Sequence, residues 1–213
     1  MNVFSDLGLM EGRIYEAIVS TYMPDNTPTA SPMGITVSGD QLRIRPFKTS
    51  TLLLGLQHSR CGVVNFTLDP YLFYITAFKE KNPNGRVPRG LFEPARSVKA
   101  PRIKSSSLYL EFKVVELIAE NERVQVCCQV THGEAAANTP NPYCRGLFAS
   151  IECIIHATRI REYIQEKRFD EVKKLLLLIK HYRGLIDRVS PSSVYSQIVD
   201  DVMRDVKRWR MTL

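Results

Sequence analysis

Residues 45–70 read RPFKTSTLLLGLQHSRCGVVNFTLDP and predict a helix, a buried strand and a second helical turn in succession. Residues 49–59 have the composition of a short helix that begins at a cluster of hydroxyl side chains, which are favoured helix caps. Residues 61–68 form an apolar run that is typical of a strand buried on both faces. Asp69 and Pro70 then predict a second helical turn, because proline is favoured at the first position of a helix.

The segments on either side of this stretch have the composition of β-strands. Residues 13–22, 29–37 and 41–46 are rich in β-branched or alternating apolar residues, and turn-forming residues separate them. Residues 107–119 and 123–131 predict two further, longer strands. The N-terminal part of the chain is therefore predicted to be mainly β.

Two segments are predicted to be loops. Residues 82–104 contain four prolines, and we expect a long, mobile loop there. Residues 132–145 are rich in alanine, asparagine and proline and are expected to form a second loop.

From residue 149 onward, apolar residues recur with helical spacing in three successive stripes. The stripes are Ile151, Ile154, Ile155 and Thr158; then Val172, Leu175, Leu176, Ile179, Tyr182, Ile186 and Val189; then Val194, Ile198, Val202, Val206 and Trp209. Ser190 and Pro191 are expected to begin the last helix. Strands followed by helices predict a mainly β plus α chain, with a β domain at residues 1–147 and a three-helix subdomain at residues 148–213.

Composition excludes several classes of protein. The chain has 213 residues, of which 44% are hydrophobic and 24% are charged, as in ordinary globular proteins. No targeting segment or long apolar run is visible, so we expect a cytoplasmic protein that does not bind membranes. The five cysteines include no C-x-x-C pair, which argues against a disulfide framework, and neither they nor the histidines have the usual spacing of metal ligands, so we predict no metal.

The net charge of +7 is concentrated in two segments. Residues 79–104 hold eight basic and two acidic side chains, and residues 159–213 hold thirteen and eight. Such segments could attract phosphates, nucleic acid or an acidic partner. Nucleic acid is the least favoured, because Phe92 is the only aromatic residue in the first segment and acidic residues alternate with basic ones in the second.

The strongest candidate for chemistry is a cluster where a strand is expected to end and a helix to begin. It consists of Arg45, Lys48, Thr49, Ser50 and Thr51. Their side chains and the free N–H groups of a helix start are the groups that bind a phosphate monoester. An ordinary basic turn with a helix cap would explain the same residues.

A second candidate lies in the strand expected at residues 29–37. It consists of Thr29, Ala30, Ser31, Pro32 and Met33, which a glycine follows. Small residues there would let a flat ring approach the backbone closely, and a bulged edge strand is the alternative.

A third candidate consists of Asn65, Phe66 and Thr67, where polar groups interrupt an apolar strand. Buried amides and hydroxyls need hydrogen-bond partners. The edge of a heterocycle or a cross-strand hydrogen bond would satisfy them equally well.

The series ASPMGI, RPFKTST and CGVVNFTLDP resembles the FMN-binding split β-barrel superfamily of flavin-reductase-like proteins. Within it, the chain is most similar to an uncharacterised archaeal family with a C-terminal helical subdomain, in which a pattern like Glu152-x-x-x-His156-Ala157-Thr158-Arg159 occurs. The motifs are individually loose, and their order and spacing carry the resemblance.

This resemblance implies a homodimer with FMN at its interface. Arg45, Lys48, Thr49, Ser50 and Thr51 would hold the phosphate, and residues 29–33 and 65–67 would flank the isoalloxazine ring. It also implies an electron donor such as NAD(P)H or a small molecule. The G-x-G-x-x-G fingerprint of dinucleotide binding is absent from the sequence, which leaves the donor open.

Two histidines are candidates for a functional role. Glu152 and His156 share a helix face, with Arg159 one turn further on, and form either an acid/base pair near the flavin or, as we favour, a structural cluster. His132 is expected in a loop, where it could line the mouth of a substrate site.

The sequence leaves two functions open. One is an FMN-dependent oxidoreductase of flavin-reductase type, and the other is a non-catalytic FMN-binding carrier or sensor. No residue is compelled to act as a proton donor, so catalytic residues are not assigned.

Overall fold

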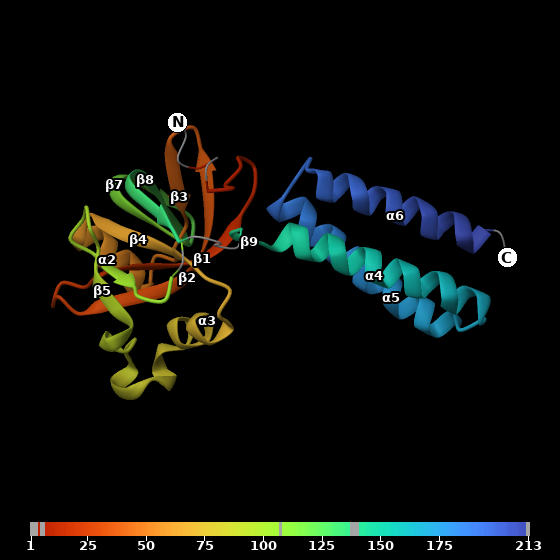
Figure 1. The fold of residues 1–213 in the computed structure, drawn as a ribbon, viewed down its shortest axis with the longest axis horizontal. Helices are drawn as coiled ribbons and strands as arrows, with labels where there is room; N and C mark the ends of the chain where they lie inside the picture. Colours follow the sequence, from red (N-terminus) through yellow and green to blue (C-terminus); the bar gives the residue numbers. More distant parts are fainter. Residues whose placement is uncertain (1–3, 5–6, 107, 137–140, 212–213) are drawn as a thin grey trace. The chain divides into compact units, whose positions relative to one another are not determined.

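The computed structural model describes residues 4, 7–106, 108–136 and 141–211, and the chain divides into two compact units (Figure 1). The first unit contains residues 1–11 and 15–143, and the second contains residues 12–14 and 144–213. The first unit holds the sheet, and the second holds three helices.

Six antiparallel strands form a closed barrel in the first unit (Figure 1). They are β1 (Tyr15–Tyr22), β2 (Pro28–Ser38), β3 (Gln41–Ile44), β4 (Cys61–Phe66), β7 (Leu108–Glu120) and β8 (Arg123–Ala135). The strands follow the order β2-β3-β8-β7-β4-β1, and β1 also pairs with β2, which closes the ring. A two-residue strand, β9 (Tyr143–Cys144), adjoins β1.

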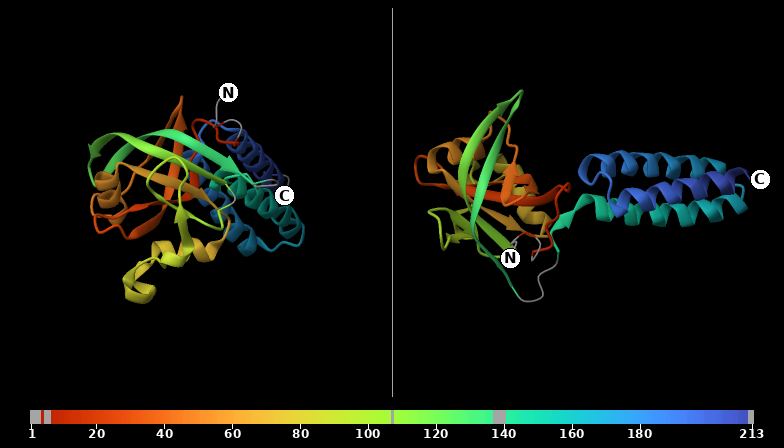
Figure 2. Two further views of the ribbon diagram at one scale, coloured as in Figure 1. Left: turned by 60° about the vertical axis from the view of Figure 1, so that its left-hand side comes forward. Right: turned by 90° about the horizontal axis from the view of Figure 1, so that it is seen from above.

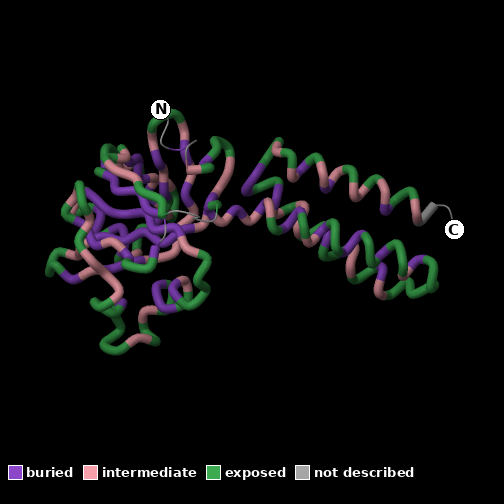
Figure 3. Tube along the Cα trace, viewed as in Figure 1, coloured by how far each residue is buried: buried purple, intermediate pink, exposed green. Residues whose placement is uncertain are grey.

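The two central strands are buried along almost their whole length, as their apolar composition predicts. Every residue of β4 is buried, and all but two residues of β1 are buried. In Figure 3 the buried residues accordingly concentrate in the barrel strands. Strand β8 continues to Ala135, so the loop expected from residue 132 begins later, and its residues 137–140 lie outside the described residues.

Helix α2 (Thr51–Ser59) lies against β1, and its position depends on one glycine. Ser50 caps the helix by accepting a hydrogen bond from the N–H group of Leu53 at 3.2 Å. A Cβ atom at Gly55 would lie 2.6 Å from the Cγ2 atom of Thr21, so only glycine permits this close approach. The hydroxyl of Thr21 also hydrogen-bonds to that of Ser59.

Helix α3 (Pro70–Ala77) begins as the sequence predicts, with proline at its first position and a side-chain cap from Asp69. Its buried face carries Leu72 and Ile75, which pack with Ile18, Ala30 and Ile103. This face anchors the helix on β1 and β2.

The segment expected to be a long, mobile loop is folded onto the barrel. Residues 82–104 form two short 3₁₀ helices, η2 (Pro83–Gly85) and η3 (Arg89–Leu91), and a hairpin of β5 (Phe92–Pro94) and β6 (Pro101–Ile103). A further 3₁₀ helix, η1 (Lys79–Lys81), directly precedes them. Ser20 donates a hydrogen bond to the carbonyl of Pro101, and Ile103 donates to the side chain of Asn65. The segment is thus not a plain loop as predicted, because prolines mark breaks in regular structure but do not reveal buried partners such as Ser20 and Asn65.

Residues 94–100, which we call the strap, are held by a carboxylate. Glu111 on β7 is fully buried, and its carboxylate accepts hydrogen bonds from the N–H groups of Arg96 and Ser97 and from the Ser97 hydroxyl. Burial raises the pKa of Glu111, but these hydrogen bonds outweigh it and hold the pKa below its ordinary value of 4.5.

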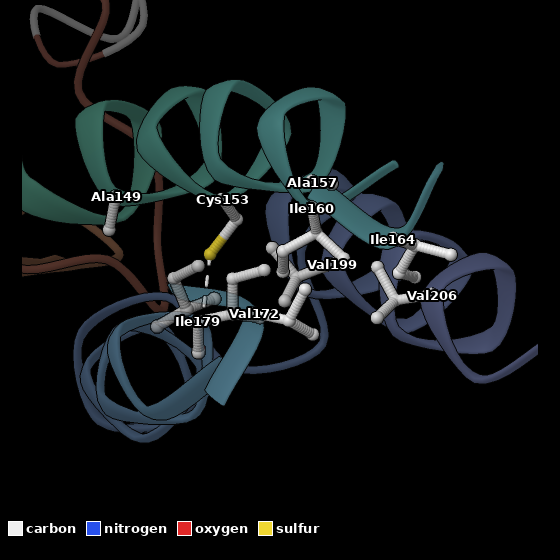
Figure 4. Packing of buried hydrophobic residues seen from close by; sticks show 10 residues of the cluster. Ala149, Cys153, Ala157, Ile160, Ile164, Val172, Ile179, Val199 and Val206 are labelled. Carbon is white, nitrogen blue, oxygen red and sulfur yellow. Dashed lines mark hydrogen bonds between the residues drawn. The ribbon is translucent and has the colours of Figure 1, made fainter. Parts of the chain in front are cut away.

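The second unit consists of α4 (Arg145–Gln165), α5 (Phe169–Val189) and α6 (Val194–Met211). Figure 4 shows its core, in which Ala149, Cys153, Ala157, Ile160 and Ile164 of α4 face residues of the other two helices. The predicted α5 stripe is buried or half-buried, and most of the α6 stripe is too. Figure 2 shows the three helices side by side.

The first predicted stripe was wrong. Ile151, Ile154 and Ile155 are between 39% and 43% exposed. Helical spacing shows which residues share a face but not which face is buried. In α4 the buried face is the one that carries the smaller residues Ala149, Cys153 and Ala157, because small side chains allow helices to approach closely. The start of the last helix also differs, since the Ser193 hydroxyl accepts a hydrogen bond from the N–H group of Ser196 and the helix begins at Val194.

The five cysteines are free and buried, in agreement with their expected role as small apolar residues. Within the part of the chain that the structure describes, no helix is long and apolar enough to cross a membrane.

We expect Glu111→Gln to lower the free energy of unfolding by about 2 kcal/mol at pH 7, because an amide cannot accept all three hydrogen bonds. The folded pKa is lowered, so the carboxylate contributes stability above pH 4.5 and loses it as the pH falls through the folded value. The difference between wild type and variant in urea melts should therefore shrink in acid. Glu122→Gln, at an exposed position, is the control, and a pH-independent difference would contradict the assignment.

Candidate anion-binding site

The side chain of Lys79 joins three residues of the predicted site. Its ammonium group donates hydrogen bonds to the hydroxyls of Thr29 and Ser31, each at 3.0 Å, and to that of Thr51 at 2.7 Å. No carboxylate pairs with this ammonium group among the residues that the structure describes. The arrangement is a cation surrounded by neutral hydroxyl groups.

Three separate elements supply these groups. Thr29 and Ser31 are two residues apart on β2 and therefore lie on one face of the strand. Thr51 is the first residue of α2, where backbone N–H groups add partial positive charge. Lys79 begins η1, and only Phe78 separates it from the end of α3. The site therefore forms only in the folded barrel.

Desolvation destabilises the charged form of the Lys79 side chain. Withdrawal from water lowers its pKa from 10.5 to about 8. This desolvated cation lowers the stability of the folded protein unless an anion lies beside it. Such a perturbed group in a pocket is a candidate for ligand binding.

A pocket of about 210 Å³ opens beside this ammonium group. Thr29, Thr51, Lys79 and Arg86 line it together with residues of the β1–β2 turn. The guanidinium group of Arg86 lies 3.2 Å from the carboxylate of Asp25, which also lines the pocket. The pocket thus contains two cations and one anion.

The predicted cluster at residues 45–51 is divided by the fold. Arg45 forms an ion pair with Glu120, and its backbone carbonyl accepts a hydrogen bond from Arg123 at 2.7 Å. The backbone N–H of Lys48 donates a hydrogen bond to the backbone carbonyl of Glu122. These contacts bind the first half of the cluster to the tip of the β7–β8 hairpin, whereas its last residue, Thr51, contacts Lys79.

Asn65 and Phe66 are part of the barrel core. Asn65 is fully buried, and its amide group donates to the carbonyls of Ile18 and Val63 and to the hydroxyl of Ser20. Its side-chain oxygen accepts from Ile103 at 2.8 Å. The cross-strand hydrogen bond that the sequence left open is therefore present, and the Asn65 side chain has no free polar atom to offer a ligand.

Other predicted residues have mainly local roles. The Thr67 hydroxyl accepts a hydrogen bond from the N–H of Asp69 in the turn before α3, and Ser50 caps α2. Thr49 is exposed. Met33 is half-buried on the same face of β2 as Thr29 and Ser31, and Pro32 lies on the opposite face.

Lys79 is the residue that the sequence analysis did not assign to the site. It was counted only as part of a basic segment, and it lies 28 residues from Thr51 and 50 from Thr29. The one available signal was its position directly after a short apolar helix, which brings the lysine back to the barrel.

The exposed face of α3 leads to this lysine. Tyr71 and Tyr74 of α3 and the flanking Leu68 and Phe78 are between 47% and 66% exposed, and the rings of Tyr74 and Phe78 are 5.5 Å apart. Phe78 directly precedes Lys79. An aromatic surface therefore begins at the residue next to the cation.

The two candidate histidines belong to different units of the chain. His156 is buried in the helical unit, with its ring 5.9 Å from that of Tyr182 and its Nε2 atom 4.0 Å from the Glu152 carboxylate. Arg159, the third residue of this predicted cluster, is exposed. His132 is a residue of β8 and not of a loop, and its Nε2 atom lies 3.6 Å from the carboxylate of Glu134.

We expect Lys79→Met to stabilise the ligand-free protein at pH 7 by on the order of 1 kcal/mol, because it removes a desolvated charge. The folded pKa lies below the ordinary lysine value, so the ammonium opposes folding below about pH 8, and this penalty disappears as the pH approaches 10.5. Urea melts in phosphate-free buffer at pH 7 and 10 test this, with exposed Lys81→Met as control. A variant less stable than wild type at pH 7 would contradict it.

The sequence matches a family model described as the N-terminal domain of a protein of unknown function, DUF447, over residues 15–137. No curated protein matches the chain. Among solved structures, the chain is similar to an FMN-bound DUF447 protein from Methanosarcina mazei, with 24% identity and a TM-score of 0.56. The similarity covers 95% of this chain and 99% of that one.

Two other solved structures share the barrel. One is a flavoredoxin from Methanosarcina acetivorans, with 17% identity, a TM-score of 0.52, and coverage of 63% of this chain and 77% of that chain. The other is the flavin reductase HpaC in complex with NADP⁺, with 17% identity, a TM-score of 0.52, and coverage of 68% and 92%. These likenesses confirm the split β-barrel fold of flavin-reductase-like proteins. With the family match spanning most of the barrel unit, this chain belongs to the DUF447 family.

Proposed function

We propose that this protein binds FMN and acts as an oxidoreductase of flavin-reductase type. The observation that carries the proposal is the Lys79 ammonium group, which is desolvated, faces three hydroxyls and has no described carboxylate partner. A phosphate group supplies the missing negative charge and accepts hydrogen bonds from hydroxyls and backbone N–H groups. The similar Methanosarcina mazei protein holds FMN, and this supports the choice of ligand.

The residues of the pocket fit a phosphate monoester. Lys79 and Arg86 supply charge, Thr29 and Thr51 supply hydroxyls, and the start of α2 supplies backbone N–H groups. Asp25 already pairs with Arg86 and opposes an anion there, so Lys79 is the main anchor. One compact anion pocket favours FMN over FAD, which carries a second phosphate.

Bound FMN would supply hydride or electron chemistry, and the chain would hold and orient it. Because Met33 shares a strand face with Thr29 and Ser31, a ring leaving the phosphate pocket along β2 would meet its side chain. A carrier or sensor without turnover remains the alternative, and anaerobic mixing of the FMN-loaded protein with NADH or NADPH separates the two.

We expect Lys79→Met to weaken FMN binding roughly tenfold to a hundredfold, which corresponds to the loss of charge-assisted hydrogen bonds to the phosphate. Riboflavin lacks the phosphate, so its affinity should not change. Fluorescence titration of both flavins measures this, and exposed Lys81→Met is the matched control.

Arg45→Ala tests the phosphate-binding residue that the sequence alone predicts. If Arg45→Ala weakens FMN binding and Lys79→Met does not, the phosphate lies at the β7–β8 hairpin, and our assignment of Lys79 is wrong. If the wild-type chain binds FMN and riboflavin equally, there is no phosphate anchor at all.

We also propose that a second copy of the chain completes the flavin site. Pockets for small molecules usually measure about 300–1,000 Å³, and the one beside Lys79 measures about 210 Å³. It can hold the phosphate end of FMN but not the three-ring isoalloxazine. The exposed aromatic face of α3 adjoins Lys79, and aromatic residues are enriched at protein interfaces.

The double substitution of Tyr71 and Tyr74 by glutamate should therefore give a monomer that binds FMN at least roughly tenfold more weakly. Light scattering coupled to gel filtration gives the mass, which should be twice 24.3 kDa for wild type. Leu177→Glu changes a residue that is 67% exposed on α5 and serves as control. A wild-type monomer with full FMN affinity would refute this part of the proposal.

A further inference from the structure

We infer that a second pocket, between the β1–β2 turn and the strap, binds a small organic acid with an apolar body. The pocket measures about 460 Å³, within the usual range of about 300–1,000 Å³ for small-molecule sites. Tyr22 and Asn26 line one side, and Pro94, Ala95 and residues 98–100 of the strap line the other. The proposal does not depend on FMN binding.

Both walls of this pocket are fixed by hydrogen bonds. Glu111 holds the strap through three of them, and the N–H of Ala95 donates to the carbonyl of Ala100 at 2.9 Å. In the turn, Met23 donates to the carbonyl of Thr27 at 2.9 Å. A site whose walls are already ordered loses little conformational entropy when a ligand binds.

The chemistry of the lining indicates the class of ligand. Ala100 is 1% exposed, and with Ala95 and Val98 of the strap it belongs to an apolar cluster that includes Cys61, Val63 and Tyr109. Lys99 and Asn26, in contrast, are exposed residues of the lining. Among the described residues Lys99 has no ion pair. An apolar lining with a single cation and an amide suits a monocarboxylate and does not suit a multiply charged phosphate ester.

This pocket is distinct from the one beside Lys79. The two share no lining residue, but both use the β1–β2 turn, since Tyr22 and Asn26 line one pocket and Met23, Asp25 and Thr27 line the other. The turn therefore separates two binding sites of different chemistry. Substitutions at one site are expected to leave the other unchanged.

Benzoate and its neutral relative benzyl alcohol are suitable probes. In NMR titrations of the full chain, benzoate should shift the amide signals of Asn26, Ala95 and Val98 in a saturable manner below about 10 mM. Lys99→Gln should weaken benzoate binding roughly threefold to fivefold, as expected for one exposed charge, and leave benzyl alcohol unchanged. Lys81→Gln is the control for nonspecific charge effects.

Two further variants make the test decisive. Ala95→Phe should fill the pocket and abolish binding of both probes, with its melting curve as a check on folding. Lys99→Glu, at an exposed position, should weaken benzoate further without any change in packing and without any effect on FMN affinity. No saturable shift in wild type, or shifts at Thr29 and Thr51 instead, would overturn the inference. Benzoate binding without FMN binding would support this pocket and contradict only the proposed flavin site.

Discussion

Strand β1 pairs along both edges, and the barrel and both pockets depend on this constraint. Its pairing with β2 sets Thr21 opposite Thr29, and its pairing with β4 sets Ile18 opposite Asn65. Because α2 packs against Thr21 through Gly55, the start of α2 comes beside the first residues of β2. The turn that leaves β1 then forms a wall of each pocket. Closure of the barrel thus assembles groups that are distant in the sequence.

Within the closed barrel, the positive charge of Lys79 is not required by the fold alone. Its three hydroxyl partners are neutral, and withdrawal from water lowers its pKa to about 8. Proteins retain such unfavourable groups chiefly where function needs them. A ligand phosphate beside Lys79 would offset the free energy that desolvation of the ammonium group costs, and this gain would favour binding. Asn65 differs, because each of its side-chain polar atoms already has a hydrogen-bond partner within the barrel.

Local signals in the sequence predicted the local structure well. The start of α2 was read from a cluster of hydroxyl residues that favour helix caps, the start of α3 from Pro70, and the strands from their apolar runs, because these preferences act over a few residues. The Lys79–Thr51 contact was missed because it depends on how the chain returns after α3. The stripe containing Ile155 was misassigned because helical periodicity does not specify which face is buried. Arg45 and Thr51 of the predicted phosphate cluster have different partners, because long-range contacts with the β7–β8 hairpin, which sequence order does not reveal, place Arg45.

The protonation equilibrium of the Lys79 side chain tests the central claim most directly. Selective isotope labelling of lysine allows its pKa to be followed by NMR with no ligand, with riboflavin and with FMN. A dianionic phosphate beside the ammonium group favours the charged form, so the account predicts a pKa near 8 that rises on addition of FMN and does not rise with riboflavin. A pKa that is the same in the presence of either flavin would contradict the account.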